Sequence, residues 1–284
     1  MILVTGATGT IGSELVPLLG RRHAVRAMTR RPARPGEVYG DLDRPETLPA
    51  VLDGVGAVFV LVPGYDDRGP AQELALVAAA RDAGVRHLVK LSTSAVVFGA
   101  TDAISAGHRA GEDVIRGSGI PWTVLRPGTF MTYLEQYADG IARERTMTVT
   151  ETDPVSAMVH PLDVAAVAAT VLTRPGHAGR EYTITGPEAL SPETQAAIVG
   201  EVIGEPVRLA VRTVAETRNM FERRGWGGPR LEALLELKRQ SGAWDHTVTD
   251  TVPRVVGRPA LTLRDWLEEH TEAFSGGGGG TARP

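Results

Sequence analysis

Short apolar runs alternate with amphipathic stretches along the first half of the chain. The run at residues 57–62, Ala-Val-Phe-Val-Leu-Val, is uninterrupted, which is typical of a strand covered on both faces. Further strands are predicted at residues 1–4, 24–29, 36–40, 88–92 and 122–125, and helices at residues 10–19, 46–52, 72–82 and 107–117. Strands that alternate with helices predict an α/β fold of the Rossmann type, with a doubly wound parallel sheet.

Beyond residue 128 the pattern becomes less regular and predicts a mixed α+β lobe. Strands are expected at residues 182–185 and 207–211, and helices at residues 162–172, 191–203 and 261–274, with Asp163 as a cap of the first helix. Thr213 with Glu216, and Thr262 with Asp265, have the spacing of capping boxes. We therefore expect a first domain at 1–128, a smaller lobe at 129–274 that partly returns to the first domain, and a disordered glycine-rich tail at 275–284.

A glycine-rich turn follows the first predicted strand. Residues 5–12 are Thr-Gly-Ala-Thr-Gly-Thr-Ile-Gly, and an amphipathic helix comes directly after them. Gly6 allows a tight turn, Gly9 allows a pyrophosphate to approach the backbone, and Gly12 allows the helix to pack closely on the sheet. The helix N-terminus offers free N–H groups to phosphates, so Thr8, Thr10 and Ile11 join the glycines as predicted contacts. This arrangement predicts a dinucleotide site.

The end of the second predicted strand indicates which dinucleotide is bound. A site for NAD(H) usually has Asp or Glu here, to accept hydrogen bonds from the ribose hydroxyls. Residues 26–36 contain no carboxylate, and the strand ends on Arg30 and Arg31. Guanidinium groups bind phosphate oxygens through paired, charge-assisted hydrogen bonds, so these two residues favour the 2′-phosphate of NADP(H). The alternative is a solvated basic loop.

Composition narrows the possible classes of protein. The formal net charge of the 284 residues is −4, which does not favour a nucleic acid or a membrane surface as a partner. There is no cysteine, and the seven histidines lack the spacing of a metal site, so no metal is expected. No apolar stretch is long enough to span a bilayer, and the chain starts inside its first strand. We expect a cytoplasmic protein that is a monomer or a homodimer.

Several motifs together resemble one family. They are the glycine turn, Arg30, Gly40-Asp41, Leu91-Ser92-Thr93, the segment Ser-Gly-Ile-Pro-Trp-Thr-Val-Leu-Arg-Pro at residues 118–127, and Tyr-Thr-Ile-Thr-Gly-Pro-Glu at residues 182–188. The chain resembles the NmrA-like proteins, atypical members of the short-chain dehydrogenase/reductase superfamily, over residues 1 to about 274. Within them it is most similar to the NAD(P)H-dependent reductases of triphenylmethane dyes and quinones. These similarities include the short loop at residues 65–69, the Ala-Gly-His segment before Glu112, and the final predicted helix.

One departure from the superfamily bears on the chemistry. Its usual catalytic pair is Tyr-x-x-x-Lys, in which the tyrosine protonates a carbonyl oxygen. Alignment from Glu112 places Ile104 at the tyrosine position and His108 at the lysine position, and the motif occurs nowhere in the chain. Either the acceptor takes hydride without concerted protonation, or hydride transfer has been lost. His108 is the candidate proton donor, and the alternative is a histidine that only contacts or supports the cofactor.

The remaining predicted contacts follow from strand ends and from the scarcity of aromatic residues. Asp41, next to Leu42, is placed to accept from the adenine amino group, and Ser92 and Thr93 are placed to contact the nicotinamide side or to cap the strand end. Val62 and Pro63 end the fourth strand beside the cofactor. The substrate pocket is expected between the nicotinamide and the second lobe, because flat conjugated ligands suit aromatic walls. Its predicted lining is Phe130, Met131, Tyr133, Tyr137, Phe221, Trp226 and Trp244, with Trp226 on a lid between glycines, while Trp266 is expected in the core.

These features predict an NADP(H)-dependent reductase of a quinone-like or other conjugated aromatic small molecule. Three alternatives remain open. One is a tailoring enzyme of aromatic secondary metabolism that performs reduction, epoxide opening or cyclisation. Another is a non-catalytic NADP(H) sensor with a protein partner, and the third is a nucleoside-sugar epimerase-like enzyme, which the missing tyrosine disfavours.

Overall fold

A computed structural model describes residues 1–62 and 68–275, and they cluster into two compact units. Unit 1 comprises residues 1–127, 161–184 and 251–258, and unit 2 comprises the remaining segments. The final segment of the chain and part of the predicted loop at 65–69 lie outside the described residues.

Unit 1 is built on a seven-stranded sheet in which every neighbouring pair is parallel. The strand order is β3-β2-β1-β4-β5-β6-β8, so the sheet grows outward from β1 in both directions, as in doubly wound folds. The bounds of the strands are β1 Ile2–Val4, β2 Val25–Thr29, β3 Glu37–Tyr39, β4 Ala57–Val60, β5 His87–Leu91, β6 Trp122–Pro127 and β8 Arg180–Ile184. The predicted Rossmann-type sheet is confirmed.

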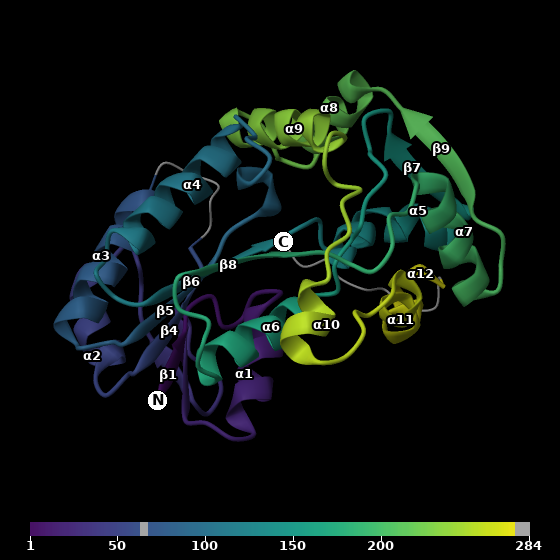
Figure 1. The fold of residues 1–284 in the computed structure, drawn as a ribbon. Coiled ribbons are helices and arrows are strands. Elements are labelled where there is room, and N and C mark those ends of the chain that lie inside the picture. Colours follow the sequence, from purple (N-terminus) through teal and green to yellow (C-terminus); the bar gives the residue numbers. More distant parts are fainter. Residues whose placement is uncertain (63–67, 276–284) are drawn as a thin grey trace. The chain divides into compact units, whose positions relative to one another are not determined.

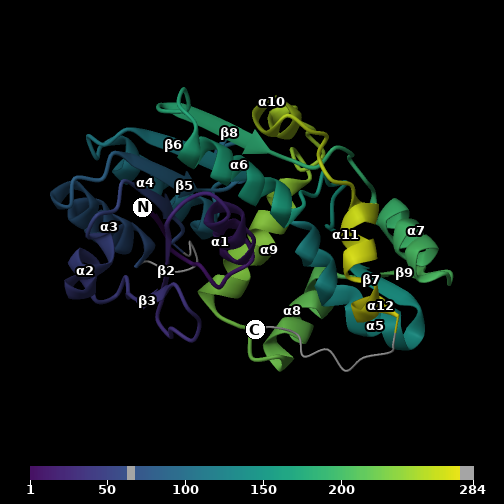
Figure 2. The same cartoon turned by 90° about the horizontal axis from the view of Figure 1, so that it is seen from below.

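Helices cover both faces of this sheet. On one face α1 packs against α6 and α6 against α10, and on the other α2, α3 and α4 pack in sequence (Figure 1; Figure 2 gives the view from below). Leu3, Val58 and Leu88 from the strands contribute to a fully buried core with residues of α2 and α3. The bounds are α1 Gly12–Gly20, α2 Leu48–Leu52 after the 3₁₀ turn η1 Pro45–Thr47, α3 Gly69–Asp82, α4 Ala103–Arg116 after the turn η2 Ser94–Val96, α6 Pro161–Thr173 and α10 Thr251–Val256.

Unit 2 combines a small parallel pair of strands with helices. β7 Thr146–Thr150 pairs with β9 Arg208–Arg212, and a core that includes Met131, Met147 and Trp266 lies among the surrounding elements. Trp266 is fully buried, as expected from the sequence. The other elements are the turn η3 Met131–Tyr137 and the helices α5 Ala138–Glu144, α7 Pro192–Ile203, α8 Val214–Arg223, α9 Pro229–Ser241, α11 Leu263–Glu269 and α12 Thr271–Phe274.

The structure differs from the predicted helices at three points. The first helix begins at Gly12, not at residue 10, because residues 9–11 still belong to the turn. The predicted final helix is interrupted at His270, whose Nδ1 lies 2.7 Å from the Trp266 carbonyl oxygen, the acceptor of a continuous helix. α6 begins at Pro161, so Asp163 lies inside its first turn and not before it, and it pairs with Arg258 at 2.7 Å. Both predicted capping boxes are confirmed.

Candidate cofactor and substrate sites

The glycine turn after β1 is fixed by its own backbone and by β4. Gly6 has a φ of +60°, and its carbonyl oxygen accepts from the Gly9 amide at 3.0 Å. A Cβ on Gly12 would lie 2.2 Å from the same oxygen, so only glycine fits there. The Thr5 hydroxyl accepts from the Leu61 amide at 2.7 Å, which ties the ends of β1 and β4 together. The turn is therefore held rigidly at the carboxyl edge of the sheet.

The exposed part of the turn faces away from the core at the start of α1. Thr8, Gly9 and Thr10 are exposed, whereas Ile11 and Gly12 are buried. No side chain caps the N-terminus of α1 in the described structure, although the Ser13 amide donates to the Gly9 carbonyl oxygen at 2.9 Å. Exposed backbone amides at a helix N-terminus bind phosphate groups, and the turn thus fits the pyrophosphate of a dinucleotide.

The arginines in and after β2 differ in whether the protein itself binds their guanidinium groups. The Arg26 guanidinium donates to the carbonyl oxygens of Val51 at 2.7 Å and Asp53 at 2.9 Å, so it closes the C-terminal end of α2. Arg30 and Arg31 are exposed beyond the strand. Because β2 is the neighbour of β1, these two residues lie on the same edge of the sheet as the glycine turn. Their contact with a 2′-phosphate remains a prediction.

The loop between β2 and β3 is closed by a carboxylate. Glu37 accepts from the backbone amides of Ala33 at 2.7 Å and Arg34 at 3.0 Å. These hydrogen bonds, the one to Ala33 first, hold the pKa of the Glu37 carboxyl below its ordinary value. The carboxylate nearest to Arg30 and Arg31 in sequence is thus engaged in shaping the loop.

Other predicted cofactor contacts lie at the following strand ends. An Asp41 carboxylate oxygen accepts from the Asp43 amide at 3.0 Å, which forms a local turn, and Leu42 packs against the core of unit 1. Val62 is buried in the same core. Pro63 lies outside the described residues.

The hydroxyl groups after β5 have structural partners. Ser92 is buried and donates to a Glu112 carboxylate oxygen at 2.6 Å. The Thr93 hydroxyl accepts from the Ala95 amide at 3.4 Å, at the start of η2. The capping role considered from the sequence is therefore present for Thr93, whereas Ser92 binds a carboxylate of α4. A contact of either residue with the nicotinamide remains a prediction.

A network of buried charges joins α4 to the sheet. Arg126 on β6 donates to both oxygens of Glu112, at 2.8 and 2.6 Å, and Arg116 adds a contact of 2.7 Å. Burial alone would raise the pKa of Glu112, but the hydrogen bonds from Arg126 and Ser92 hold it below its ordinary value. Glu112 is therefore a fixed anion that orients α4 and the end of β5.

A second buried ion pair lies beside this network. Lys90 on β5 pairs with Glu73 on α3, and both side chains are almost inaccessible. Burial raises the pKa of Glu73, and the charge of Lys90 opposes that shift. The carboxylate lies directly against α4, since a Cβ on Gly111 would be 1.6 Å from a Glu73 carboxylate oxygen. This ion pair was not predicted from the sequence, where its signal was a lysine within an otherwise apolar strand.

His108 lies on α4, one helical turn before Glu112 and one after Ile104. Burial and, to a smaller extent, the charge of Lys90 together lower the pKa of His108 to about 3, although the charge of Glu112 opposes the shift. The imidazole is therefore neutral at pH 7, and it has no proton to give as an imidazolium.

The predicted substrate residues divide by burial. Met131, Tyr137 and Trp244 are buried within unit 2, whereas Phe130, Tyr133 and Phe221 are partly exposed and Trp226 is exposed. The ring centroids of Phe221 and Trp226 are 6.1 Å apart, and the Arg230 guanidinium lies 4.3 Å from the Trp226 ring centroid. A shallow pocket of about 270 Å³ surrounds this ring.

A polar cluster in unit 2 was not predicted as such. Asp153 accepts from the Tyr137 hydroxyl at 2.8 Å and from the Thr150 amide at 2.9 Å, and it pairs with the Lys238 ammonium at 2.6 Å. The same ammonium lies 5.2 Å from the Tyr133 ring centroid. Tyr133 and Tyr137 were predicted, but Asp153 and Lys238 lie 20 and 105 residues from Tyr133, too far for a local motif to connect them.

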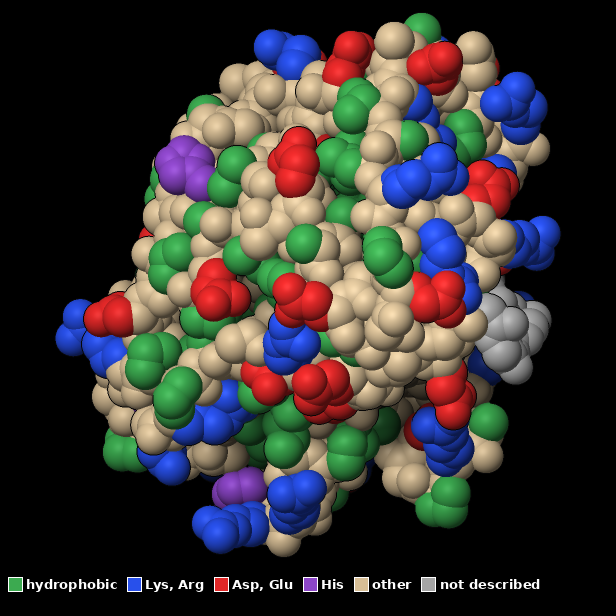
Figure 3. All heavy atoms as spheres, turned by 90° about the vertical axis from the view of Figure 1, so that its right-hand side faces the viewer, with side chains coloured by type: hydrophobic (Ala, Val, Ile, Leu, Met, Phe, Trp, Pro, Cys, Tyr) green, Lys and Arg blue, Asp and Glu red, His purple; other side chains and the backbone are tan. Residues whose placement is uncertain are grey.

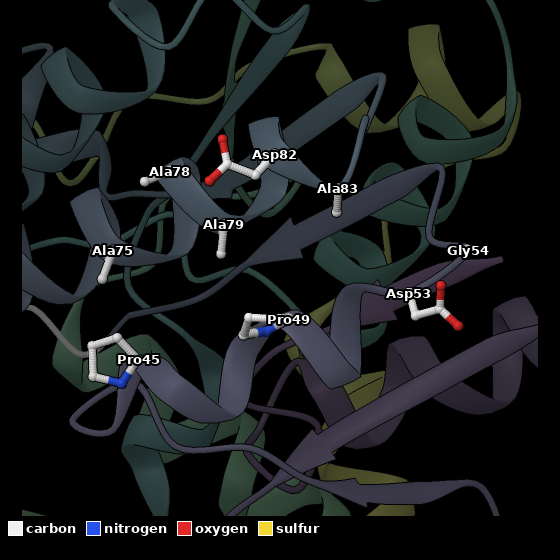
Figure 4. A pocket seen from close by; sticks show the side chains of 9 residues that line it. All are labelled: Pro45, Pro49, Asp53, Gly54, Ala75, Ala78, Ala79, Asp82 and Ala83. Atoms are coloured by element: carbon white, nitrogen blue, oxygen red, sulfur yellow. The ribbon is translucent and has the colours of Figure 1, made fainter.

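A pocket of about 490 Å³ lies between α2 and α3, lined by small residues with Asp53 and Asp82 (Figure 4), and it offers no cation to a phosphate. Acidic and basic side chains are interspersed on the face drawn in Figure 3. Within residues 1–62 and 68–275, no group of histidines and carboxylates is arranged to bind a metal ion. No helix in the same ranges is both long enough and apolar enough to cross a membrane.

Comparison with known proteins identifies relatives of the whole chain. A family model described as NAD(P)H-binding matches residues 6–175. A (4-alkanoyl-5-oxo-2,5-dihydrofuran-3-yl)methyl phosphate reductase of Streptomyces griseus subsp. griseus is 40% identical over 290 residues, which cover 97% of this chain and 99% of the relative. An NAD(P)H azoreductase of Xenophilus azovorans is 37% identical over 288 residues, 96% of this chain and 99% of the relative.

One similar solved structure is the NADPH complex of the quinone oxidoreductase QOR2 of Escherichia coli. The two structures match with a TM-score of 0.85 at 22% sequence identity, over 95% of this chain and 100% of the QOR2 chain. This similarity concerns the fold, and it agrees with the glycine turn and the strand order found here. The family model and the two relatives establish the family as well as the fold, because their matches extend over more than half of the chain. The chain belongs to the NAD(P)H-binding, NmrA-like family of atypical short-chain dehydrogenases/reductases, and it is an NAD(P)H-dependent oxidoreductase.

Proposed function

We propose that this protein uses NADPH to reduce a conjugated small molecule, quinone-like or otherwise aromatic, without protonation by a residue of α4. The neutral state of His108 carries this proposal. Ile104 and His108 stand where related enzymes have a proton donor and its lysine, and the imidazole has a pKa of about 3. An acceptor that needs an acid in the transition state would be reduced poorly at such a site.

The chain's residues fit the cofactor that this reaction needs. Bound NADPH supplies a hydride. The rigid turn of Gly6, Gly9 and Gly12 leaves room for a pyrophosphate, and Arg30 and Arg31 are exposed on the same sheet edge for a 2′-phosphate. The fixed Glu112–Arg126 pair holds α4 and the end of β5 in place.

The acceptor must carry the negative charge itself. When hydride adds to one end of a conjugated system, the displaced electron pair moves to an oxygen or nitrogen at the other end. Water can protonate that atom later, so no acidic side chain is required at the moment of transfer. Quinones and azo groups both meet this condition, as does a carbon–carbon double bond conjugated to carbonyl groups.

The two relatives support this class of acceptor. The printed name of one describes azo reduction, and that of the other describes a dihydrofuranone whose ring double bond is conjugated to a ring carbonyl and an alkanoyl group. The dihydrofuranone reductase is 40% identical to this chain. This relative favours a second candidate function, which is a reductive tailoring step on a conjugated intermediate of secondary metabolism. Because the relative is a reductase, it favours reduction over epoxide opening or cyclisation.

A turnover screen tests the proposed function. We expect NADPH oxidation with menadione, with a hydroxynaphthyl azo dye or with an α-acyl butenolide. The control is Gly9→Val, which places a branched side chain at the exposed turn and should abolish cofactor binding while the protein stays folded. Tight NADPH binding with no oxidation by any of these acceptors would contradict the proposal and favour a sensor.

Cofactor preference is tested by Arg30→Ala. Loss of one charge-assisted phosphate contact costs about 1.5–3 kcal/mol, or roughly tenfold to over a hundredfold in affinity. We expect calorimetry to show weaker NADPH binding and unchanged NADH binding. Arg26→Ala is the matched control, because the Arg26 guanidinium is engaged with α2. An NADPH/NADH ratio that stays constant in Arg30→Ala and in Arg31→Ala would refute the assignment.

A further inference from the structure

The loop at residues 30–36, between β2 and β3, binds its own backbone amides. The Arg31 amide donates to a threonine hydroxyl oxygen at the end of β2 at 3.2 Å. The amides of Ala33 and Arg34 donate to the Glu37 carboxylate at 2.7 and 3.0 Å, and the residues at 32 and 35 are prolines without an amide hydrogen. The protein itself thus engages every amide hydrogen of residues 31–35, so a ligand of this segment must be bound by side chains.

Glu37 closes this loop with both its side chain and its backbone. A single carboxylate oxygen, Oε2, accepts from both loop amides. The Glu37 amide donates to the Arg34 carbonyl oxygen at 3.1 Å, and the Ala27 amide of β2 donates to the Gly36 carbonyl oxygen at 3.1 Å. Gly36 has a φ of +85°, a conformation that favours glycine. The loop is therefore fastened at the start of β3.

The closed loop presents guanidinium groups on an ordered backbone. Arg30, Arg31 and Arg34 are all exposed. The two prolines reduce the number of conformations that the loop can adopt when it is not held by Glu37. A ligand that binds a loop already in its bound conformation does not bear the cost of ordering it. The pKa of Glu37 lies below its ordinary value, chiefly through the hydrogen bond from Ala33, so the carboxylate stays an acceptor at neutral pH.

The position of Glu37 also separates it from the usual role of a carboxylate near this strand. Glu37 is the first carboxylate after β2 in the sequence. In sites for NAD(H), a carboxylate at the end of the second strand accepts from the ribose hydroxyls. Here Glu37 is in register with Ala27, two residues before β2 ends at Thr29, and its Oε2 is directed to the amides of the loop. The carboxylate therefore serves the loop that carries the arginines.

We propose that Glu37 is a positioning residue for cofactor selection, which closes the loop so that Arg30 and Arg31 are ordered for the 2′-phosphate of NADPH before the cofactor binds. This inference rests on the proposed function, and all the residues that it uses belong to unit 1. It adds a second requirement to the positive charge of the arginines, namely the order of the loop. The opposite effect of Glu37, repulsion of the phosphate by its negative charge, predicts tighter NADPH binding when the carboxylate is removed.

The first experiment compares Glu37→Ala with Glu37→Gln by calorimetric titration of NADPH and NADH. Loss of the hydrogen bonds to a charged acceptor should weaken NADPH binding about tenfold in Glu37→Ala and leave NADH binding unchanged. Glu37→Gln should keep most of the NADPH affinity, because one amide oxygen can accept from both loop amides as Oε2 does. The control is Glu205→Ala, which removes an exposed carboxylate that accepts from Arg145 in unit 2, and it should change neither affinity.

A second experiment separates this inference from the proposed function. Adenosine 2′,5′-bisphosphate has the 2′-phosphate but no nicotinamide, so its weaker binding to Glu37→Ala would support the inference even if the wild type reduces no acceptor. Hydrogen exchange of the cofactor-free protein should show that the amides of Ala33 and Arg34 lose protection in Glu37→Ala and keep it in Glu37→Gln.

Three results would count against the inference. Tighter NADPH binding in both Glu37 variants would show that the carboxylate only repels the phosphate. An unchanged NADPH/NADH ratio in Glu37→Ala, with a wild type that prefers NADPH, would overturn the inference alone. A wild type that binds NADPH and NADH equally would refute the cofactor choice on which the inference rests.

Discussion

Each unit of the protein contains one buried lysine–carboxylate pair, and the two pairs have different neighbours. In unit 1 Lys90 pairs with Glu73 and its charge acts on His108, and in unit 2 Lys238 pairs with Asp153 beside Tyr133. A cation beside an imidazole keeps that base neutral, which removes an acid. A cation beside a phenol leaves an O–H group that can donate. The comparison shows that two similar buried pairs act on different neighbouring groups, an imidazole in unit 1 and a phenol ring in unit 2.

The largest expected effect comes from removing one partner of a buried pair. Lys90→Met leaves the Glu73 carboxylate buried and unpaired, which typically costs about 3–5 kcal/mol of unfolding free energy. Denaturant titration measures this cost, and the double variant with Glu73→Gln should recover part of it. Lys238→Met should be comparably costly. Only Lys90→Met should also raise the pKa of His108, measured by NMR, and an equal response of His108 to Lys238→Met would break the comparison.

The pH dependence of stability gives the next largest effect. The pKa of His108 is about 3 in the folded protein and ordinary in the unfolded chain, so the unfolded state binds the extra proton between these values. His108 therefore contributes stability that is present above about pH 6.5 and lost as the pH falls toward 3. The loss is about 1.4 kcal/mol per pH unit in that window.

The variant His108→Gln isolates this contribution. It lacks the titrating ring, so between pH 6 and pH 4 its unfolding free energy should fall less steeply than that of the wild type. Chemical denaturation at a series of pH values measures both slopes. Parallel slopes would show that the imidazole is protonated at its ordinary pKa. The claim that Lys90 helps to keep His108 neutral would then be wrong.

The smallest effect compares the two tyrosines by stability alone. Tyr137→Phe removes a hydrogen bond to the buried carboxylate of Asp153, which should cost about 1–3 kcal/mol. Tyr133→Phe removes a hydroxyl that lies beside Lys238 without a hydrogen bond of normal geometry among the described residues, so its unfolding free energy should stay within about 0.5 kcal/mol of the wild type. A larger loss in Tyr133→Phe than in Tyr137→Phe would mean that the Tyr133 hydroxyl serves the fold.

The parts of the molecule that the sequence predicted well are those set by local spacing. The three glycines of the turn, the end of β2 at Arg30 and both capping boxes depend on contacts within a few residues. The alternation of strands and helices was enough to predict a parallel sheet, because its strands are buried on both faces. The interruption at His270 was missed because it depends on a single side-chain contact with the Trp266 carbonyl.

The buried charged clusters could not be predicted in the same way. Lys90 and Glu73 come from different elements, and Tyr133, Asp153 and Lys238 span more than a hundred residues. Their proximity depends on how strands and helices are aligned, which hydrophobic periodicity does not define. The same limit applies to His108, since its depressed pKa arises from burial and from a lysine on another element. The sequence indicated which residue to examine, but its protonation state required the structure.

The most direct measurement is the rate of hydride transfer to menadione in a single turnover, followed by stopped flow from pH 5 to pH 9. The wild type and His108→Ala should have rates within a few-fold of each other, since a neutral imidazole donates no proton. Neither profile should contain an ionisation near pH 6–7. A more than hundredfold loss in His108→Ala with unchanged NADPH affinity, or a wild-type ionisation near pH 6.5 that the variant lacks, would instead make His108 the proton donor.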